Sequence, residues 1–410
     1  MVAKRLFNHY YTSIELKISR TGGSVRPIIL ITICAIAISA TGEVVTFPLE
    51  YNRNDFVVID SDFVKVYLVN GVVSGESGSP QITSEPLHIL LPPDAKLLSA
   101  TIRSAIWGTL AHGVPFPAQP PSILSAGSPG TVAPDSGLYL RNRYFPESPV
   151  LSASQGNLAG YNLAGVCVAP VRWNPFEKKC EYLISGELAV EFDRGHWAPK
   201  APARRSPIGD GIWRSAVSSL VLNEAELNSY TINIDPDAYD WAIFGPSGFT
   251  AGLQNLSWFR KSWALKDTVV ALEDVYTAFP GADNAEKLRN AIDYFYTTYG
   301  ISYVVILGDA GVAPDRTVFA MDCEAGFYDN ENEIRADLYF ADLDGDWNFD
   351  SDTVFGEVAD SVDIYPDVFI GRFSVEHLSQ LSGFVSKIET YESLPGGTFP
   401  GSGLMLGQIL

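Results

Sequence analysis

The sequence predicts an α/β domain with a parallel sheet in its second half, preceded by an all-β domain. Residues 301–309 read Ile-Ser-Tyr-Val-Val-Ile-Leu-Gly-Asp and are apolar on both faces, as a strand covered on both sides is. A helix with clear end signals comes directly before this strand. Up to about residue 193, by contrast, no long helical period is present. These three observations set the fold class.

The helix before the strand is predicted over residues 283–299. Asp283 is its expected N-cap, Glu286 is the capping-box partner, and Gly300 is the C-terminal stop. Its inward face consists of Leu288, Ala291, Ile292, Phe295 and Tyr299. Helix, glycine and buried strand form one unit of a βαβ sheet, in which ligands usually bind at the carboxyl ends of the strands. Asp309 is therefore expected at the functional edge.

Three further strands are predicted at residues 240–244, 268–272 and 367–373. A helix over residues 249–264 would bury Phe249, Leu253, Leu256, Phe259 and Trp263. A second helix, capped by Ser374, would bury Leu378, Leu381, Val385, Ile388 and Tyr391. The order β-α-β-α-β favours parallel neighbouring strands with helices on both faces. Residues 403–410 resemble the start of a fifth strand.

Residues 41–193 contain short strand-like runs separated by Gly, Pro and Ser, which is typical of an all-β sandwich. The runs are 57–59, 64–69, 88–91, 166–172 and 187–192, and residues 113–137 are expected to be a surface loop.

Residues 194–238 are predicted to be a linker or activation segment with a short amphipathic stretch at 212–222. Its Arg204-Arg205 pair is either a processing site or a solvated basic patch, and both alternatives require exposure.

The net charge and the N-terminal residues limit the classes of function that the protein can have. A formal net charge of −20 argues against nucleic-acid binding, which needs Lys and Arg to neutralise phosphates. Basic residues precede an apolar run at 27–40, which is too short to span a bilayer comfortably and ends in small residues at Ser39 and Ala40. We expect residues 1–40 to be a signal peptide and the protein to be secreted or at the cell surface. An uncleaved anchor and a buried core segment remain open as alternatives.

The cysteines are not expected to form a disulfide. Cys34 lies in the predicted signal, and Cys167 and Cys180 flank the turn Asn174-Pro175. If Trp173 pairs with Cys180, Cys167 lies roughly 20 Å away along the hairpin. A disulfide needs Cα atoms within about 7 Å. We therefore expect both to be small buried hydrophobic residues.

Alternating carboxylates in one loop suggest a calcium site. Between residues 322 and 367 the sequence has fifteen Asp or Glu but a single basic residue, Arg335. The predicted ligands are Asp342, Asp344, Asp346, Asp350 and Asp352, since Ca²⁺ takes six to eight oxygen ligands. The spacing is not that of an EF-hand, because the glycine falls at the fourth position and the twelfth is Thr353. A solvated acidic loop is the alternative.

No catalytic residue is assigned. The histidines are His9, His88, His112, His196 and His377, and all but the last precede the α/β domain. Cys323 lies between Asp322 and Glu324, whose charges would raise the pKa of a thiol. A Cys323–His377 dyad is therefore disfavoured.

Nucleotide binding is also disfavoured, because Gly308-Asp309-Ala310-Gly311 has neither the Lys nor the spacing of a phosphate loop.

Seven stretches between residues 240 and 392 occur together and in a fixed order. They are residues 241–245, 258–261 (Trp-Phe-Arg-Lys), 269–276, 292–309, 337–342 (Asp-Leu-Tyr-Phe-Ala-Asp), 367–374 (Asp-Val-Phe-Ile-Gly-Arg-Phe-Ser) and 387–392 (Lys-Ile-Glu-Thr-Tyr-Glu). In this order they resemble the gingipain family of secreted cysteine peptidases. The stretches 91–96 and 163–175 are similar to the propeptide domain of the family.

The resemblance implies a caspase-like α/β fold for residues 239–410, a zymogen whose propeptide packs on its own catalytic domain, and bound calcium. It implies a secreted endopeptidase that acts on protein or peptide substrates through a Cys-His dyad. The family's Gly-His-Gly loop and catalytic Cys would fall after Leu410, so we expect the sequence to stop before the dyad. A non-catalytic secreted or surface calcium-binding protein with a peptidase-like fold is the alternative.

Overall fold

The computed structural model describes residues 42–119, 131–319, 321–325, 328–331, 334–360 and 362–393. The predictions for residues 1–40, including His9 and Cys34, and for the fifth strand at 403–410 lie outside this range.

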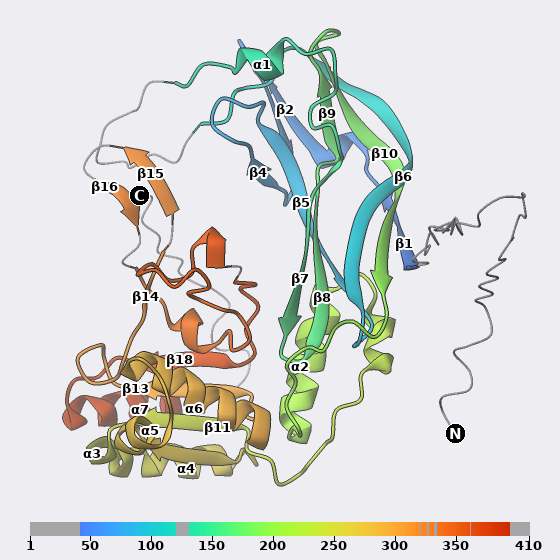
Figure 1. Ribbon diagram of the computed structural model, residues 1–410. Coiled ribbons are helices and arrows are strands. Elements are labelled where there is room, and N and C mark those ends of the chain that lie inside the picture. The colour runs from blue at the N-terminus through green and yellow to red at the C-terminus, as the bar shows by residue number, and fades with distance from the viewer. Residues whose placement is uncertain are drawn as a thin grey trace, which may run out of the picture. The chain divides into compact units, whose positions relative to one another are not determined.

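Residues 42–193 form antiparallel sheets (Figure 1). One joins β1 (Glu43–Glu50), β10 (Lys179–Asp193), β6 (Lys96–His112) and β9 (Val171–Asn174), and another joins β4 (Val72–Ser74), β5 (Ile82–Leu90), β8 (Tyr161–Val168) and β7 (Val150–Leu158).

These two sheets share one hydrophobic core. Leu87, Ile89, Ala164 and Val166 of the second sheet pack with residues of β10 and β6, among them Leu188 and Val190. The hairpin of β2 (Phe56–Asp60) and β3 (Val64–Leu68) contributes to the same core. The short α1 (Ser136–Tyr139) begins at the end of the predicted surface loop. The sequence did not reveal the continuous β6 strand of 17 residues. We call residues 42–193 the β domain.

The hairpin register around the cysteines was predicted in part. Cys180 does pair with Trp173. Cys167, however, lies on β8 and pairs with Pro86 and Ser152 in the other sheet, because the chain changes sheets between β8 and β9. The expectation that Cys167 lies further along the same hairpin is therefore wrong. Both cysteines are free, with Cys180 buried and Cys167 only half-buried.

The predicted linker is folded. Its main element is α2 (Pro207–Leu220), capped by Ser206, followed by the 3-10 helix η3 (Glu224–Ser229). Arg204 forms an ion pair with Asp235, and Arg205 is 0% exposed. The expectation of an exposed basic pair is thus wrong for Arg205, because its backbone pairs with Asn233 and Asp235. A protease could reach its peptide bond only after this segment opens.

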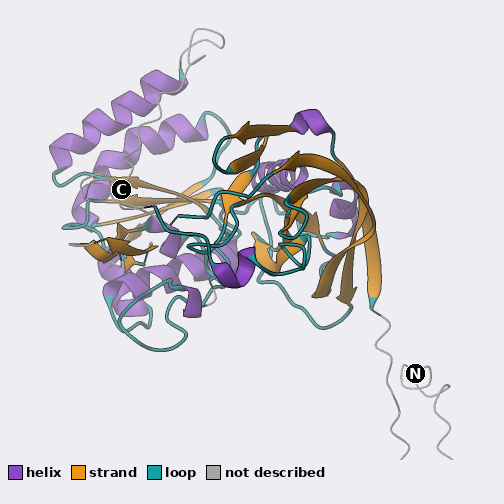
Figure 2. Cartoon of the chain, turned by 90° about the horizontal axis from the view of Figure 1, so that it is seen from above, coloured by secondary structure: helices purple, strands orange, loops and turns teal. Residues whose placement is uncertain are grey.

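The second half of the chain contains the predicted parallel sheet. Its strand order is β12 (Asp267–Ala271), β11 (Trp241–Gly245), β13 (Tyr303–Leu307) and β18 (Phe369–Phe373), and every neighbouring pair is parallel. The strand that the sequence singled out, β13, is central and its Val304, Ile306 and Leu307 are buried. Helices cover the sheet (Figure 2).

Each face of the sheet has its own helices. On one face pack α5 (Leu272–Ala278) and α6 (Asn284–Tyr299), and on the other pack α3 (Ser247–Thr250), α4 (Gln254–Lys261) and α7 (Leu378–Glu392), with η4 (Ala251–Leu253). The N-cap of α6 is Asp283 as predicted, and Gly300 has the left-handed φ of 74°. Glu286 accepts a hydrogen bond from Ala282, one residue earlier than a capping box requires. The sequence missed α5.

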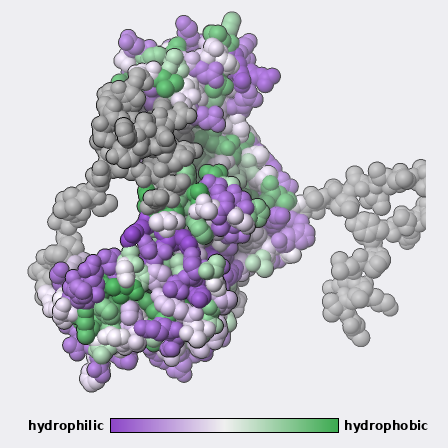
Figure 3. Space-filling view, turned by 60° about the vertical axis from the view of Figure 1, so that its left-hand side comes forward, coloured by the Kyte–Doolittle hydropathy of each residue, from purple (hydrophilic) through white to green (hydrophobic). Residues whose placement is uncertain are grey.

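The end of the described chain differs from the prediction in its details. The N-cap of α7 is His377 and not Ser374. Leu381 and Val385 are buried as expected, whereas Leu378 in the first turn of α7 and Tyr391 in its last turn are exposed. Two short antiparallel strand pairs open the acidic region: β14 (Thr317–Val318) with β17 (Ile334–Arg335), and β15 (Met321–Ala325) with β16 (Tyr328–Glu331). The 3-10 helices η5 (Asp337–Phe340) and η6 (Val358–Asp360) follow. Hydrophilic and hydrophobic residues are mixed over the face drawn in Figure 3.

Candidate metal centre

Three aspartates converge where β18 begins. The N–H of Asp367 donates to the carbonyl of Ala341 at 2.8 Å, so the chain entering β18 is tied to the chain leaving η5. Oδ2 of Asp367 then accepts the N–H of Leu343 at 2.9 Å. These two hydrogen bonds hold Asp367 beside Asp342 and Asp344, although the residues are separated in the sequence by the rest of the acidic loop.

Asp342 is held by a tight turn. Its Oδ1 accepts the N–H of Gly345 at 2.8 Å. A Cβ at position 345 would lie 2.6 Å from Oδ2 of Asp342, so the glycine leaves room for the carboxylate. The Asp342 residue is fully buried, and among the residues that the structure describes its Oδ2 has no hydrogen-bond partner. A buried carboxylate oxygen without a donor is costly unless a cation faces it.

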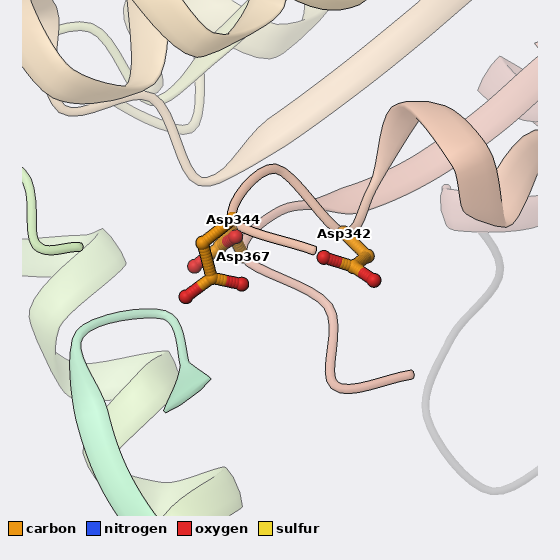
Figure 4. A group of neighbouring side chains, drawn as sticks. All are labelled: Asp342, Asp344 and Asp367. Carbon is orange, nitrogen blue, oxygen red and sulfur yellow. The ribbon is translucent and has the colours of Figure 1, made fainter. Parts of the chain in front are cut away.

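The spacing of the three carboxylates suits one cation. One oxygen from each of Asp342, Asp344 and Asp367 lies within 4.8 Å of the other two. Calcium binds oxygen at about 2.3–2.6 Å, so two ligands on opposite sides of the ion are roughly 5 Å apart. Figure 4 shows Asp344 and Asp367 side by side with Asp342 beyond them. The group has only oxygen ligands, which hard cations prefer.

The carboxyl groups are held in an environment that disfavours their charges. Burial raises the pKa of Asp342, and it raises the pKa of Asp367 well above its ordinary value, with the charge of Asp344 adding to the rise. Asp344 retains exposed surface, but protein atoms crowd its carboxyl and raise its pKa to about 6. A fourth carboxyl, Asp363, has its pKa raised to about 7 by burial and by the charges of Asp344 and Asp342.

Two basic residues lie near this group, and both are engaged elsewhere. Nζ of Lys200 donates to the carbonyl of Leu343 and pairs with Asp293, each at 2.9 Å. The guanidinium of Arg289 donates to the backbone carbonyls of Tyr339, Asp342 and Gly345. Both charges favour the ionised aspartates, but their hydrogen bonds go mainly to other oxygens. The cluster therefore carries an excess of negative charge when ionised.

The five predicted ligands do not form one cluster. Asp342 and Asp344 are joined by Asp367, whereas Asp350 and Asp352 form a second, more exposed group with Glu357. Asp346 accepts the N–H of Asn348 and stabilises a turn. The reason for the split is Asp360, which is fully buried and accepts the N–H groups of Phe349, Gly356 and Glu357. That anchor folds the second half of the loop into a separate unit.

The sequence prediction missed Asp367, which was counted as part of a strand. An acidic residue directly before a buried apolar strand is a signal that could have identified it. This placement also means that the carboxylates lie at the amino end of β18, whereas Asp309 follows β13 at the opposite edge. The two candidate regions therefore lie on opposite edges of the sheet.

The sequence profile described as Peptidase family C25 matches residues 234–406. Over these residues the chain is similar to peptidase family C25, the gingipain family. The match covers less than half of the chain and includes the whole parallel sheet together with the three converging aspartates. No curated protein sequence matches the chain.

Solved structures of proteins from Porphyromonas gingivalis are among those similar to the chain. The complex of RgpB pro- and mature domains is 15% identical, with a TM-score of 0.36, and covers 46% of this chain and 96% of that chain. Gingipain K, in a structure concerned with its zymogenic latency, is 17% identical, with a TM-score of 0.28, and covers 34% of this chain and 81% of that one. Dimeric latent PorU, also from P. gingivalis, is 13% identical, with a TM-score of 0.27 and coverage of 85% and 43%. These TM-scores do not establish a shared fold.

The residues considered for C25 cysteine-peptidase chemistry are scattered. His88 is on β5, His112 ends β6, His196 pairs with Asp193 after β10, and His377 caps α7. Cys323 is on β15, where the described structure includes the backbone only. Asp309 caps a turn through its carbonyl, which accepts the N–H groups of Val312 and Ala313.

Within the described residues, no helix is long and apolar enough to cross a membrane.

Proposed function

We propose that the chain is the propeptide domain and the N-terminal part of the catalytic domain of a secreted cysteine endopeptidase, made as a zymogen. Residues 42–193 would be the propeptide domain, and residues 239–410 would belong to a caspase-like peptidase domain. The observation that carries the proposal is the match of residues 234–406 to peptidase family C25. Export through a signal peptide at residues 1–40 is part of the same proposal.

The contacts of the β domain support a propeptide role. Leu158, Tyr161 and Leu163 of the β domain form a core with Trp213 of α2, and Phe369 of β18 packs against that core. The rings of Trp213 and Phe369 are stacked with their centroids 4.2 Å apart. A propeptide that shares a core with the peptidase sheet can stabilise the sheet while the chain folds.

These contacts are located at the amino edge of the sheet. Phe369 is the first residue of β18, and Asp240, which accepts the hydroxyl of Ser206, directly precedes β11. In α/β sheets, ligands bind at the carboxyl edge, and a nucleophilic thiol and its base are expected there. We propose that the Cys-His dyad of the complete enzyme attacks peptide carbonyls at that edge, on the side of Asp309, with the β domain docked at the other edge.

The test is to express the whole open reading frame that contains this sequence and to assay it before and after proteolytic removal of the β domain. We expect peptide hydrolysis that appears on removal and is abolished by thiol alkylation. An intact product that hydrolyses no peptide after removal, under reducing conditions and with calcium present, would overturn the proposal. It would instead favour the non-catalytic calcium-binding alternative.

A further inference from the structure

The sheet of β4, β5, β8 and β7 has one face turned away from the core of the β domain. Val166 of β8 packs in the core that the two sheets share. Successive side chains of a strand point to opposite faces, so Leu163 and Gly165 lie on the outer face, with His88 of β5 paired beside Gly165. On that face Leu163 packs with Trp213. The outer face is therefore the one that meets the rest of the chain.

Two glycines leave a slot in this outer face. Gly156 of β7 pairs with Leu163, and Leu163 precedes Gly165 by two residues, so both glycines lie on the same side of the sheet. Neither glycine has a φ in the left-handed region, so the backbone does not require glycine at these positions. A glycine inside a strand leaves no side chain to pack and often marks the close approach of another group. We call the gap above Gly156 and Gly165 the glycine slot.

The side chain of Tyr365 fills the glycine slot. Tyr365 lies between η6 and β18, more than 190 residues after the slot in sequence. A Cβ at position 156 would overlap Cδ2 of Tyr365, and a Cβ at position 165 would lie 3.0 Å from its hydroxyl oxygen. The ring of His88 meets the Tyr365 ring edge to face, with the centroids 5.9 Å apart. The tyrosine ring therefore spans the two glycines and is bounded by His88.

Tyr365 is presented by a strained turn. Ile364 has a φ of 57°, a left-handed conformation that β-branched residues rarely adopt. The carboxylate of Asp363 holds the turn: Oδ1 accepts the N–H of Tyr365 at 2.9 Å, and Oδ2 accepts the N–H of Asn157 in β7 at 2.7 Å. A strained residue persists only where its surroundings fix it. The β domain supplies part of that fixation, through Asn157 and through the glycine slot.

We propose that the glycine slot is the site at which the β domain recognises the part of the chain that carries the parallel sheet, that Tyr365 determines this recognition, and that docking holds Ile364 in a conformation that relaxes when the β domain leaves. A flat aromatic ring reaches from one glycine to the other. Once Ile364 has relaxed, its strain must be restored before the β domain can dock again, so departure is favoured over return. The inference adds a recognition residue to the proposed propeptide role, and its tests use no peptide substrate, so its failure is distinguishable from a failure of the proposed peptidase function.

The first experiment measures undocking through trypsin cleavage after Arg205. Arg205 is 0% exposed, and its Nη2 donates to the carbonyl of Ala159 in the β domain at 2.7 Å, so cleavage there requires the β domain to separate from this segment. The initial rate of formation of the fragment that ends at Arg205 is measured by mass spectrometry. Tyr365→Ala should raise this rate about tenfold or more, and Tyr365→Phe, which keeps the ring, should stay within about twofold of the wild type. An unchanged rate in Tyr365→Ala, or a Tyr365→Phe chain cleaved as fast as Tyr365→Ala, would overturn the proposal.

The second experiment tests the fit between the slot and the ring with two double-mutant cycles. Gly156→Ala should speed cleavage in the wild-type chain but add nothing to Tyr365→Ala, where the ring is already absent. Gly165→Ala is the milder change: it should speed cleavage in the wild-type chain but not in Tyr365→Phe, which lacks the hydroxyl that a Cβ would crowd. Gly371→Ala in β18 is the matched control, a strand glycine with open space around it, and should leave the rate unchanged. Glycine substitutions that act equally with and without their partner atoms on Tyr365 would show that the slot does not recognise the ring.

The third experiment tests the strain at Ile364. Asparagine tolerates the left-handed conformation, and the Ile364 side chain is 65% exposed, so Ile364→Asn should stabilise the docked turn with little loss of packing. Cleavage after Arg205 should therefore slow by about three- to tenfold. Val358→Asn is the control, because Val358 is a β-branched residue that is 93% exposed and whose φ is not positive. If Ile364→Asn were cleaved as fast as the wild type or faster, docking would not hold Ile364 under strain.

Discussion

Replacing Trp213 tests whether the β domain and the parallel sheet are held by a shared core. The side chain is 1% exposed, lies on α2 and stacks on Phe369. Trp213→Ala removes the whole ring from a close-packed site, which typically costs about 3–5 kcal/mol. Loss of the stacked aromatic pair is included in that figure and accounts for about 0.5–1.5 kcal/mol of it.

Trp213→Phe separates packing from hydrogen bonding. Nε1 of Trp213 is buried and, in the described part of the chain, has no hydrogen-bond partner. Phenylalanine loses part of the buried ring, at about 1–2 kcal/mol, but it also removes an unsatisfied N–H that costs about 1–3 kcal/mol. The two terms nearly cancel. We therefore expect Trp213→Phe to be close to neutral, within about 1 kcal/mol of the wild type.

The assay is urea unfolding followed by circular dichroism, together with the rate of trypsin cleavage after Arg205. Trp258→Ala is the control, because Trp258 is 73% exposed and surface substitutions usually change stability by less than about 0.5 kcal/mol. If Trp213→Ala cost no more than Trp258→Ala, the shared core would not hold the two parts together. If Trp213→Phe were as destabilising as Trp213→Ala, the argument from the unpaired N–H would be wrong.

Three further outcomes follow from single residues. Gly300→Ala should destabilise the chain by more than about 2 kcal/mol in urea unfolding, because φ is 74° and an added Cβ would overlap the carbonyl oxygen of Arg204. Gly383→Ala is the control: the space around Gly383 is open, so this substitution should not lower the free energy of unfolding. Burial raises the pKa of the Cys180 thiol to about 12, so native Cys180 should resist alkylation at neutral pH and react only on unfolding; mass spectrometry showing it labelled in the native chain would contradict this. Burial lowers the pKa of His88, so the unfolded chain binds a proton at this residue more readily than the folded chain does. The folded chain therefore loses stability as the pH falls from the ordinary histidine pKa near 6.5 toward the lowered pKa, and above 6.5 the neutral His88 costs no stability. His88→Gln should flatten that part of the stability curve, and an unchanged slope would exclude His88 as its source.

The parallel sheet could be predicted because its signals are local. The strand around Val304 and Ile306 is apolar on both faces, and Asp283 and Gly300 mark the ends of the preceding helix with side-chain and backbone chemistry that acts within a few residues. The helix ends that were misplaced lack such signals. His377 is an unusual N-cap, and Ser374 offered the expected chemistry three residues too early.

The candidate site was predictable only in part because half of it is brought together by the tertiary fold. Asp342 and Asp344 stand out in sequence as alternating carboxylates near a glycine. Asp367 joins them only because the chain returns to start β18, and Asn157 joins them only because the β domain docks at that edge. No spacing rule relates an asparagine in one domain to an aspartate about two hundred residues later. The acidic loop is also divided by Asp360, whose buried carboxylate looks in sequence like any other member of the run.

The position of the cluster constrains what a bound ion can do. The three aspartates lie at the amino edge of the sheet, and Asn157 of the β domain donates hydrogen bonds to Asp344 and Asp367. If the β domain is a propeptide that is removed on activation, its departure exposes these carboxylates to water. A cation held by them should then bind more tightly before the β domain is removed than after it, because water weakens the attraction between opposite charges. An ion needed for turnover would show the reverse order, because its ligands would have to remain with the mature domain.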